Sequence, residues 1–331
     1  MVNLKDIAGK AGVSTATVSL ALHGGAGRRR VSKKRTELIR SIAESLNYRP
    51  NSAARMMASS RTRQIGVLLR NAPDIPKRNP ANFETILGIG GFLSGRDYMQ
   101  VIVPLNRIEE EISRSNRIFS ERILDGIIVM DVHSSRLYSY VKRNFSSALF
   151  LDTNLWKKNL CMRRDERKAG AMAAEALKSS GYRKIVYVGH GMGQSPHFSV
   201  LERYEGVMEV LGGNAGFETV DVSDKGKLVS ILSRPSKETG IICYDTLIAR
   251  YLHSTLSMSG FVPPRDYGLV SCDDSHETEL TFPMLSRVSY NRYEMGRIAA
   301  QMIVESIESP GHPTPSRLFD VSWIPGGTIR K

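Results

Sequence analysis

Cysteine and long apolar runs are both scarce in this chain of 331 residues. Only three cysteines occur, Cys161, Cys243 and Cys272, and they lie far apart. Their number and spacing indicate neither a disulfide framework nor a C-x-x-C metal or redox motif. No apolar run approaches the ~20 residues of a membrane span, and the first residues lack the apolar stretch of a secretory signal. We therefore expect a cytoplasmic protein without a membrane partner.

Acidic residues are scarce in the first part of the chain. Residues 1–64 hold three acidic side chains against thirteen Lys and Arg, a net of +10, whereas the whole chain carries +13. A concentrated basic segment is typical of nucleic-acid binding, because Lys and Arg displace the counterions condensed on phosphates. A disordered basic tail would carry the same charge. The helical periodicity of the apolar residues in this segment argues against a tail.

Motifs of catalysis are also missing. The run Gly189-His190-Gly191-Met192-Gly193 follows an apolar strand but lacks the G-x-G-x-x-G spacing of a dinucleotide loop. Neither H-E-x-x-H nor G-x-S-x-G occurs in the sequence. An enzyme is the rival class of protein, and these absences disfavour it. We expect no catalytic residues, no cofactor and no metal.

Three short helices are predicted in the first 49 residues. In the first and third, apolar residues repeat at helical spacing: Leu4, Ile7, Ala8 and Ala11, then Leu38, Ile39, Ile42, Ala43 and Leu46. Gly12 can end the first helix, and Ser14 can cap a second from Thr15 to about Leu22. Ser32 is expected to cap the third helix. Three helices with a tight first turn indicate a helix-turn-helix domain.

The sequence resembles the LacI/GalR family of bacterial repressors over its whole length. The most specific matches lie in the first 67 residues: Leu4-Lys5-Asp6-Ile7-Ala8, Ala11-Gly12-Val13-Ser14, Thr17-Val18-Ser19, Val31-Ser32, Tyr48-Arg49-Pro50-Asn51, Ala54-Arg55 and Ile65-Gly66-Val67. Weaker matches follow: Asp125-Gly126-Ile127-Ile128, Arg203-Tyr204-Glu205-Gly206, Cys272-Asp273-Asp274, Tyr293-Glu294-Met295-Gly296 and Gly326-Gly327-Thr328.

In the rest of the chain, apolar β-rich runs such as 65–69, 126–130 and 148–151 alternate with helical stretches of about ten to twenty residues. This alternation predicts parallel sheets with crossover helices. The resemblance implies an N-terminal all-α helix-turn-helix domain plus an α/β two-lobed domain like a periplasmic binding protein, with three crossovers between the lobes. The expected bounds are as follows: 1–49 for the DNA-binding domain, 50–64 for a hinge helix and linker, and 65–331 for the effector-binding and dimerisation domain. Within it we expect an N-lobe of about 65–156 and 291–317 and a C-lobe of about 157–290 and 318–331.

DNA contacts are implied residue by residue. Thr15, Ala16 and Leu20 of the second helix match base-contacting positions of the family. Leu20 stands where relatives commonly have arginine, so we expect it to contact a thymine methyl rather than guanine; packing inside the domain is the alternative. Contacts to phosphates or a groove are expected from Ser14, Thr17, Ser19, Arg28, Arg29, Arg30, Asn51 and Arg55. For the arginine trio, the alternative is a solvated basic loop.

Residues 50–58 resemble the family's hinge helix, which becomes ordered on DNA and lies in the minor groove. Met57 aligns with the leucine that wedges between the central base pairs. An apolar wedge can unstack a base step and kink the DNA, and methionine is long and soft enough for that role. Core packing is the alternative for Met57.

An effector site is implied for the second part of the chain. Arg203 and Asp273 match the family's recurrent effector contacts, and an arginine with a carboxylate suits a polyol. Asp152 matches a ligand-facing strand end, and Tyr244 stands where relatives often have asparagine. A salt bridge within a lobe is the alternative for the charged three. Other candidates for a stacking face are Trp156 and Phe83, for which core or lobe-edge packing is the alternative.

We therefore expect a sequence-specific transcription regulator of the repressor type. It would bind a palindromic double-stranded DNA operator as a homodimer, under control of a small-molecule effector of the carbohydrate type held between two lobes. The alternative is a constitutive DNA-binding protein whose core only dimerises. A change of DNA affinity on adding ligand separates the two.

Overall fold

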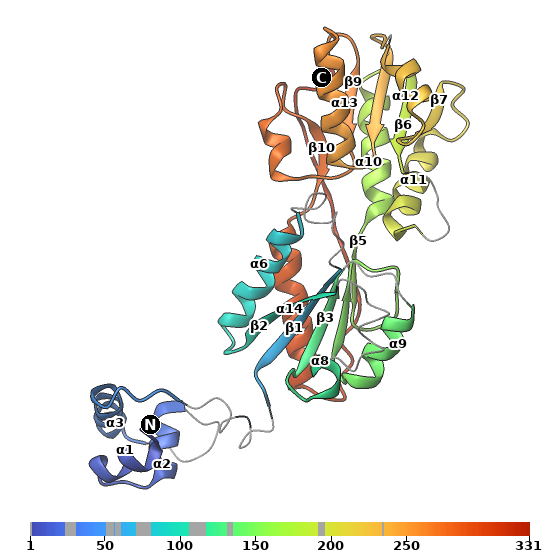
Figure 1. Ribbon diagram of the computed structural model, residues 1–331. Coiled ribbons are helices and arrows are strands. Elements are labelled where there is room, and N and C mark those ends of the chain that lie inside the picture. The colour runs from blue at the N-terminus through green and yellow to red at the C-terminus, as the bar shows by residue number, and fades with distance from the viewer. Residues whose placement is uncertain are drawn as a thin grey trace. The chain divides into compact units, whose positions relative to one another are not determined.

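The chain divides into two compact units, Met1–Arg61 and Thr62–Lys331, in the computed structural model shown in Figure 1. The structure describes residues 2–23, 31–50, 56, 61–70, 81–105, 117–130, 135–190, 196–233 and 235–331. Among the helices in these ranges, none combines the length and the apolar character that a membrane crossing requires.

The smaller unit contains three helices: α1 (Leu4–Ala11), α2 (Thr15–His23) and α3 (Lys33–Ser45). Gly12 ends α1 with a φ of +64°, a left-handed conformation that glycine adopts without steric cost. The backbone N–H of Thr17 donates to Ser14 Oγ at 3.2 Å, so Ser14 caps α2. Because both signals are local, the tight turn between α1 and α2 forms where the sequence predicts it.

A small apolar core holds the three helices together. It consists of Ile7, Ala8, Val18, Ala21, Ile39 and Ala43. The pattern also placed Leu38 on the inner face of α3, but Leu38 is 50% exposed, because Ile39 and Ile42 take that face. Ser32 occupies the N-cap position of α3 without a capping hydrogen bond from its side chain, so its expected cap is only positional.

The larger unit is built on two six-stranded sheets. The first has the order β11-β5-β4-β3-β1-β2, and all its pairings are parallel. Its strands are β1 (Gln64–Arg70), β2 (Met99–Leu105), β3 (Gly126–Met130), β4 (Ala148–Leu151), β5 (Cys161–Arg164) and β11 (Arg317–Phe319). In the register, Val67 of β1 lies between Ile102 and Ile128. The apolar run that predicted β1 is therefore the centre of a buried sheet.

The second sheet has the order β12-β10-β9-β8-β6-β7 and is parallel except for the antiparallel strand β12. Its strands are β6 (Lys184–Gly189), β7 (Phe217–Asp221), β8 (Thr239–Cys243), β9 (Gly268–Ser271), β10 (Ser286–Ser289) and β12 (Ser322–Ile324). Parallel strands at the centre of each sheet require crossover helices, which the alternating sequence pattern predicted.

Three crossovers connect the two lobes. The chain passes from β5 to the second lobe, returns after β10, and crosses again between β11 and β12. The two-lobed architecture is as expected, but the first crossing follows Arg164, whereas the expected C-lobe began at 157. Strand β5 has only four residues and two are arginines, so it lacks an apolar pattern. The third crossing follows Phe319, two residues beyond the expected end of the N-lobe at 317.

Helices cover both faces of each sheet (Figure 1). In the first lobe these are α6 (Ala81–Ser94), α8 (Arg117–Ser120), α9 (Ser135–Asn144) and α14 (Arg292–Glu308). In the second lobe they are α10 (Glu166–Ser179), α11 (Phe198–Leu211), α12 (Lys225–Leu232), α13 (Thr246–Met258) and the short 3₁₀ helix η1 (His276–Leu280).

Glycine brings one helix pair in each lobe into backbone contact. A Cβ atom on Gly296 of α14 would lie 2.1 Å from the carbonyl oxygen of Thr85 in α6. A Cβ atom on Gly206 of α11 would lie 1.9 Å from the carbonyl oxygen of Arg167 in α10. No other residue permits this approach without moving a backbone. The contact at Gly206 brings Arg203 of α11 next to Glu166 at the start of α10.

Candidate functional site

One face of α2 is free of the apolar core. Thr15 and Ala16, at the N-terminus of the helix, are exposed, whereas Val18 and Ala21 are buried. Leu20 is partly exposed and is not among the residues that form or cover the core. The N-terminal side chains of α2 are thus presented to solvent, the arrangement by which a recognition helix reaches base edges in a major groove.

Polar and basic side chains flank this face. Thr17 and Ser19 are partly exposed on α2. Lys33, Lys34 and Arg35 are exposed in the first turn of α3, where no acidic residue offsets them. Cations at a helix N-terminus oppose the helix dipole, and a bound phosphate relieves that repulsion. The other predicted DNA contacts lie outside the described residues: Arg28, Arg29, Arg30, Asn51, Arg55 and Met57.

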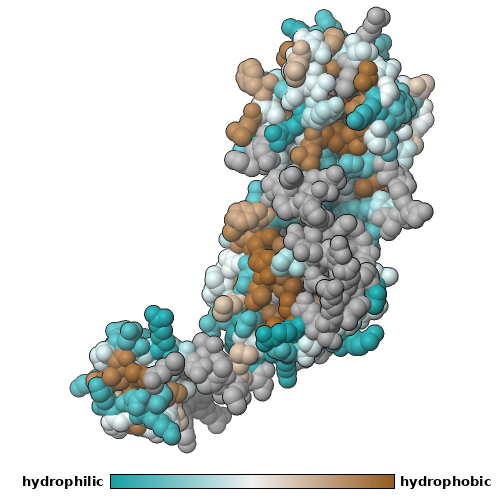
Figure 2. Space-filling view, in the orientation of Figure 1, coloured by the Kyte–Doolittle hydropathy of each residue, from teal (hydrophilic) through white to brown (hydrophobic). Residues whose placement is uncertain are grey.

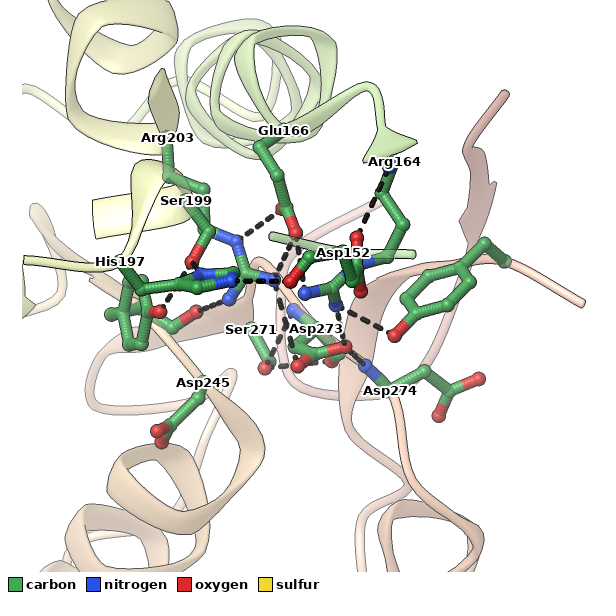
Figure 3. Close-up of polar contacts among 12 residues, drawn as sticks. Asp152, Arg164, Glu166, His197, Ser199, Arg203, Asp245, Ser271, Asp273 and Asp274 are labelled. Carbon is green, nitrogen blue, oxygen red and sulfur yellow. Dashed lines mark hydrogen bonds and ion pairs between the residues drawn. The ribbon is translucent and has the colours of Figure 1, made fainter. Parts of the chain in front are cut away.

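A second group of predicted site residues meets where strands of both sheets end. Asp152 directly follows β4 of the first lobe, Tyr244 directly follows β8 of the second, and Asp273 lies just beyond β9. Asp152 has a φ of +52°, so the chain turns sharply at this strand end. In open α/β sheets, ligands bind beyond the carboxyl ends of the strands. Arg203 of α11 lies at the same junction (Figure 3).

Arg203 is held by a carboxylate that the sequence did not single out. Its Nε lies 2.5 Å from Glu166 Oε2, and its Nη2 lies 2.9 Å from Glu166 Oε1 (Figure 3). Its Nη1 donates to the carbonyl oxygen of Tyr244, and its Nη2 also lies 3.5 Å from Asp273 Oδ2. The two-pronged pairing uses the full fork of the guanidinium. Arg203 is therefore paired within the protein.

Arg164 connects the two lobes at the first crossover. Its Nε lies 2.7 Å from Asp152 Oδ2, and its Nη2 lies 2.9 Å from Glu166 Oε1. Its Nη1 donates to the hydroxyl of Tyr290 at 2.6 Å, and Tyr290 belongs to the second crossover. One side chain thus contacts the first lobe and two of the three segments that join the lobes.

Arg292 completes the arrangement from the start of α14. Its Nη2 lies 2.6 Å from Asp273 Oδ1 and donates to the carbonyl oxygen of Asp274 at 2.6 Å. We use "ion network" for three arginines and three carboxylates: Arg164, Arg203, Arg292, Asp152, Glu166 and Asp273. Their formal charges cancel, which is what burying six ionised groups requires.

The ion network stabilises the carboxylate of Asp273 in the charged form. Burial raises the pKa of Asp273, but Arg292, Arg203 and Arg164 outweigh that effect and lower the pKa to about 2. Burial also raises the pKa of the Tyr244 phenol, which stays neutral and hydrogen-bonds to Ser199 Oγ at 2.6 Å. Asp273 is therefore ionised at all pH values near neutral.

Direct hydrogen bonds also join the lobes beside the ion network. Asn154 Nδ2 donates to the carbonyl oxygen of Pro196, and the N–H of Phe198 donates to Asn154 Oδ1, both at 2.8 Å. His197 Nε2 lies 3.0 Å from the carbonyl oxygen of Asp152. The start of α11 is thus tied to the loop that follows β4, and a movement of one lobe against the other must break these bonds.

Three members of the ion network were not predicted from the sequence: Arg164, Glu166 and Arg292. A signal was present for two of them, because the charged run Arg163-Arg164-Asp165-Glu166 begins within a buried strand, where charge is costly unless it is paired. Arg292 lies in no comparable pattern. Asp245 begins α13 apart from the ion network, and its Oδ1 accepts from the N–H of Ile248 (Figure 3).

The two additional stacking candidates are not part of the ion network. Phe83 is 63% exposed on α6, and Trp156 is 43% exposed with its ring 5.5 Å from the guanidinium of Arg163. Within the ranges that the structure describes, no three His, Cys, Asp or Glu side chains form a group that could hold a metal ion.

The smaller unit has the helix-turn-helix arrangement of DNA-binding domains, and it is followed by a two-lobed α/β unit. Comparisons agree with this arrangement. Residues 3–51 match the model of bacterial regulatory proteins of the lacI family, and residues 174–329 match a periplasmic binding protein-like domain. The chain therefore joins a DNA-binding domain that matches the lacI family of bacterial regulatory proteins to a periplasmic binding protein-like domain.

Relatives align over nearly the whole chain. The ribose operon repressor of Haemophilus influenzae is 24% identical over 94% of this chain and 93% of its own length. The ribose operon repressor of Bacillus subtilis is 28% identical over 100% of this chain and 99% of its own. The lac repressor dimer bound to operator and the anti-inducer ONPF has the same fold, with a TM-score of 0.79, 19% identity, and coverage of 100% and 99%.

Proposed function

We propose that this protein is a transcriptional repressor that binds a palindromic DNA operator as a dimer and changes its operator affinity when a small molecule binds between its lobes. One observation carries the proposal: the same chain joins a helix-turn-helix with an exposed recognition face to a two-lobed unit with a charged junction. Its relatives include named repressors. The family consists of regulators, and we propose that the chain is not an enzyme and acts in the cytoplasm.

For the DNA interface we propose that α2 enters the major groove, with Thr15, Ala16 and Leu20 at base edges. Ser14, Thr17 and Ser19 would contact phosphates from the same helix and its cap. The proposal extends to residues outside the described ranges: Arg28, Arg29 and Arg30 on the flanking backbone, Asn51 and Arg55 beside the groove, and Met57 as the wedge. These assignments give a DNA-binding domain of 1–49 with a hinge and linker of 50–64.

For the dimer we propose a contact through the first lobe. Five large apolar side chains are exposed on neighbouring elements there: Phe83, Leu87, Met99, Ile102 and Tyr293. Figure 2 shows apolar side chains gathered on the α6 side of this lobe. Exposed apolar patches rarely remain open to water in a monomer. A palindromic operator requires two copies, and this face supports their association.

Effector binding is proposed at the lobe junction, through Asp152, Arg203, Tyr244 and Asp273. The four come from both lobes, so a molecule bound among them would favour one relative arrangement of the lobes. A ligand shifts an equilibrium only by its different affinity for the two states. Two relatives are named ribose operon repressors, which supports a carbohydrate as the effector.

Selection of DNA from a random pool tests the proposal. The purified protein should enrich an inverted repeat. The slope of log affinity against log salt concentration should be about −0.9 for each phosphate contact. Repeating the selection with a sugar panel should change the amount of operator bound. Enrichment of a single half-site, with an affinity that does not depend on salt, would contradict the proposed repressor function. Operator binding that no compound alters would favour the alternative, a constitutive DNA-binding protein.

A further inference from the structure

Asp125 holds the backbone at the point where the larger unit begins. The N–H of Thr62 donates to Asp125 Oδ1 at 2.7 Å, and the hydroxyl of Thr62 donates to the same oxygen at 2.9 Å. The N–H of Arg63 donates to Asp125 Oδ2 at 2.9 Å. Hydrogen bonds to a carboxylate are about twice as strong as those between neutral groups. One side chain therefore fixes the first two residues of this unit.

The sheet register brings Asp125 to this position. Ile65 of β1 pairs in parallel with Gly126 of β3, and the N–H of Asp125 donates to the carbonyl oxygen of Gln64 at 2.8 Å. The residues that precede the two strands therefore lie side by side (Figure 1). A Cβ atom on Gly126 would lie 2.9 Å from Cδ1 of Ile307, so the last turn of α14 packs against the same edge of the sheet.

Arg63 is fixed through both its backbone and its side chain. Its φ of +55° is left-handed, a conformation that costs energy for a residue with a Cβ atom and persists where surrounding contacts impose it. Its carbonyl oxygen accepts from the N–H of Met99 at 2.8 Å. Its guanidinium lies 4.9 Å from the ring centre of Tyr98, and its Nη1 lies 3.7 Å from Glu308 Oε1. We use "linker anchor" for Thr62, Arg63, Tyr98, Asp125 and Glu308.

The linker anchor lies where the DNA-binding unit is attached. Residues 1–61 form the smaller unit, and Thr62 is the first residue of the larger one. In a dimer on an inverted repeat, two DNA-binding units are tethered to one pair of lobes, and the tether limits which half-sites both can reach at once. Fixed attachment points narrow that range, so a different spacing of half-sites requires the anchor to open.

We propose that Asp125 is a positioning residue for operator recognition: it fixes the point at which each DNA-binding unit is tethered and thereby restricts the spacing of half-sites that the dimer accepts. The proposal rests on the proposed function, because it requires a dimer on an inverted repeat. The discrimination that Asp125 supplies is limited by the free energy of opening the anchor. One hydrogen bond to a charged group is equivalent to about a tenfold change in affinity.

Two operators of different spacing test the proposal on the full-length protein. One is the inverted repeat that the parent enriches, and the other carries two additional base pairs at its centre. Fluorescence anisotropy would measure both affinities, and their ratio is the readout. We expect the parent to prefer the first operator by at least about tenfold. In Asp125→Asn an amide NH₂ replaces one acceptor oxygen, so the ratio should fall by at least about threefold.

The ratio distinguishes a positioning role from a purely structural one. A loss of stability alone would weaken binding to both operators by the same factor, and an unchanged ratio in Asp125→Asn would overturn the proposal. Asp97→Asn is the matched control, because Asp97 is exposed before β2 and its φ of +58° is one that asparagine tolerates. It should keep the ratio of the parent. If Asp125→Asn fails to fold, Thr62→Val decides the question, since it removes the hydroxyl bond and should also lower the ratio.

Hydrogen exchange in the absence of DNA separates this proposal from the proposed function. The amides of Thr62 and Arg63 should exchange faster in Asp125→Asn than in the parent, and equal rates would overturn the linker anchor whether or not an operator is bound. If the amides respond but the operator ratio does not, the repressor stands and the positioning role is wrong. If the protein enriches no inverted repeat, both the repressor function and the positioning role fail.

Discussion

The helix-turn-helix unit and the lobe junction use polar residues in opposite ways. In the smaller unit, a minimal apolar core supports three helices. The candidate DNA contacts Thr15 and Ala16 are exposed and do not belong to that core. At the junction, six ionised side chains are largely buried and paired with one another. A substitution on the exposed face of α2 should change recognition and leave folding intact. At the junction, the proposed effector contacts belong to the same groups that stabilise the fold.

The largest expected effect comes from removing one arginine of the ion network. Arg164→Met leaves Asp152 and Glu166 without their shared partner, and breaking a buried ion pair costs about 3–5 kcal/mol. Urea unfolding of the larger unit would measure this loss. The control Arg167→Met removes an arginine that is 53% exposed, and its cost should stay below about 1 kcal/mol. Equal losses in the two variants would show that the ion network contributes no more than a surface pair.

A slightly smaller loss of stability is expected from adding a side chain where α10 and α11 touch. Gly206→Ala would place a methyl group 1.9 Å from the carbonyl oxygen of Arg167, so the helices must separate, at a cost of about 3 kcal/mol. Thermal unfolding would measure this loss of stability. Gly181→Ala is not a suitable control, because Gly181 has a φ of +76°, which strains any other residue. Gly226→Ala is suitable, since the nearest atom to its Cβ would be 3.6 Å away. A Gly206→Ala protein as stable as its parent would mean that the close approach is not required.

Acid should weaken the larger unit through Asp273. Its pKa is lowered to about 2 in the folded protein, against about 3.9 in an unfolded chain. The carboxylate therefore stabilises the fold above about pH 4, and this contribution, about 2 kcal/mol, is lost as the pH falls toward 2. Stability measured between pH 5 and pH 2 should fall less steeply in Asp273→Asn than in the parent. Parallel curves would contradict the pairing of Asp273 with the three arginines.

The smallest expected effect has the opposite sign and lies in the DNA-binding unit. A Cβ on Gly9 within α1 would meet no atom within 4 Å, so Gly9→Ala should stabilise this unit by about 1 kcal/mol through helix propensity. Hydrogen exchange of the α1 amides would measure the gain. Faster exchange in Gly9→Ala would indicate a contact at this face that the isolated chain does not show.

Local patterns explain which parts of the fold could be predicted from the sequence. Periodicity, Gly12 and Ser14 located α1 and α2, and continuous apolar runs located strands such as β3 and β4. Strands β5 and β10 escaped prediction because they are four residues long and carry arginine and serine in buried positions. Their charges are tolerated only because distant residues neutralise them, and no local pattern reports a distant partner.

In the candidate site, too, the residues marked by local patterns could be predicted and those defined by a distant partner could not. Asp152 and Asp273 could be proposed from strand ends and family resemblance, and the structure brings both to one junction with Arg203 and Tyr244. Glu166 escaped prediction because its importance lies in its pairing with Arg203, 37 positions further along the chain. That pairing depends on the backbone contact between α10 and α11, which a sequence pattern does not specify.

The central claim is that a molecule bound at the lobe junction controls operator affinity. Fluorescence anisotropy of a labelled operator fragment, with and without a neutral sugar that binds the parent, tests it most directly. We expect at least a fivefold change of operator affinity in the parent, roughly the lower end of allosteric coupling. The same change is expected in the control Glu209→Gln, because Glu209 is half exposed and pairs with Arg167 outside the ion network. The response should be absent in Asp273→Asn. An unchanged operator affinity in the parent, or a full response in Asp273→Asn, would contradict the claim.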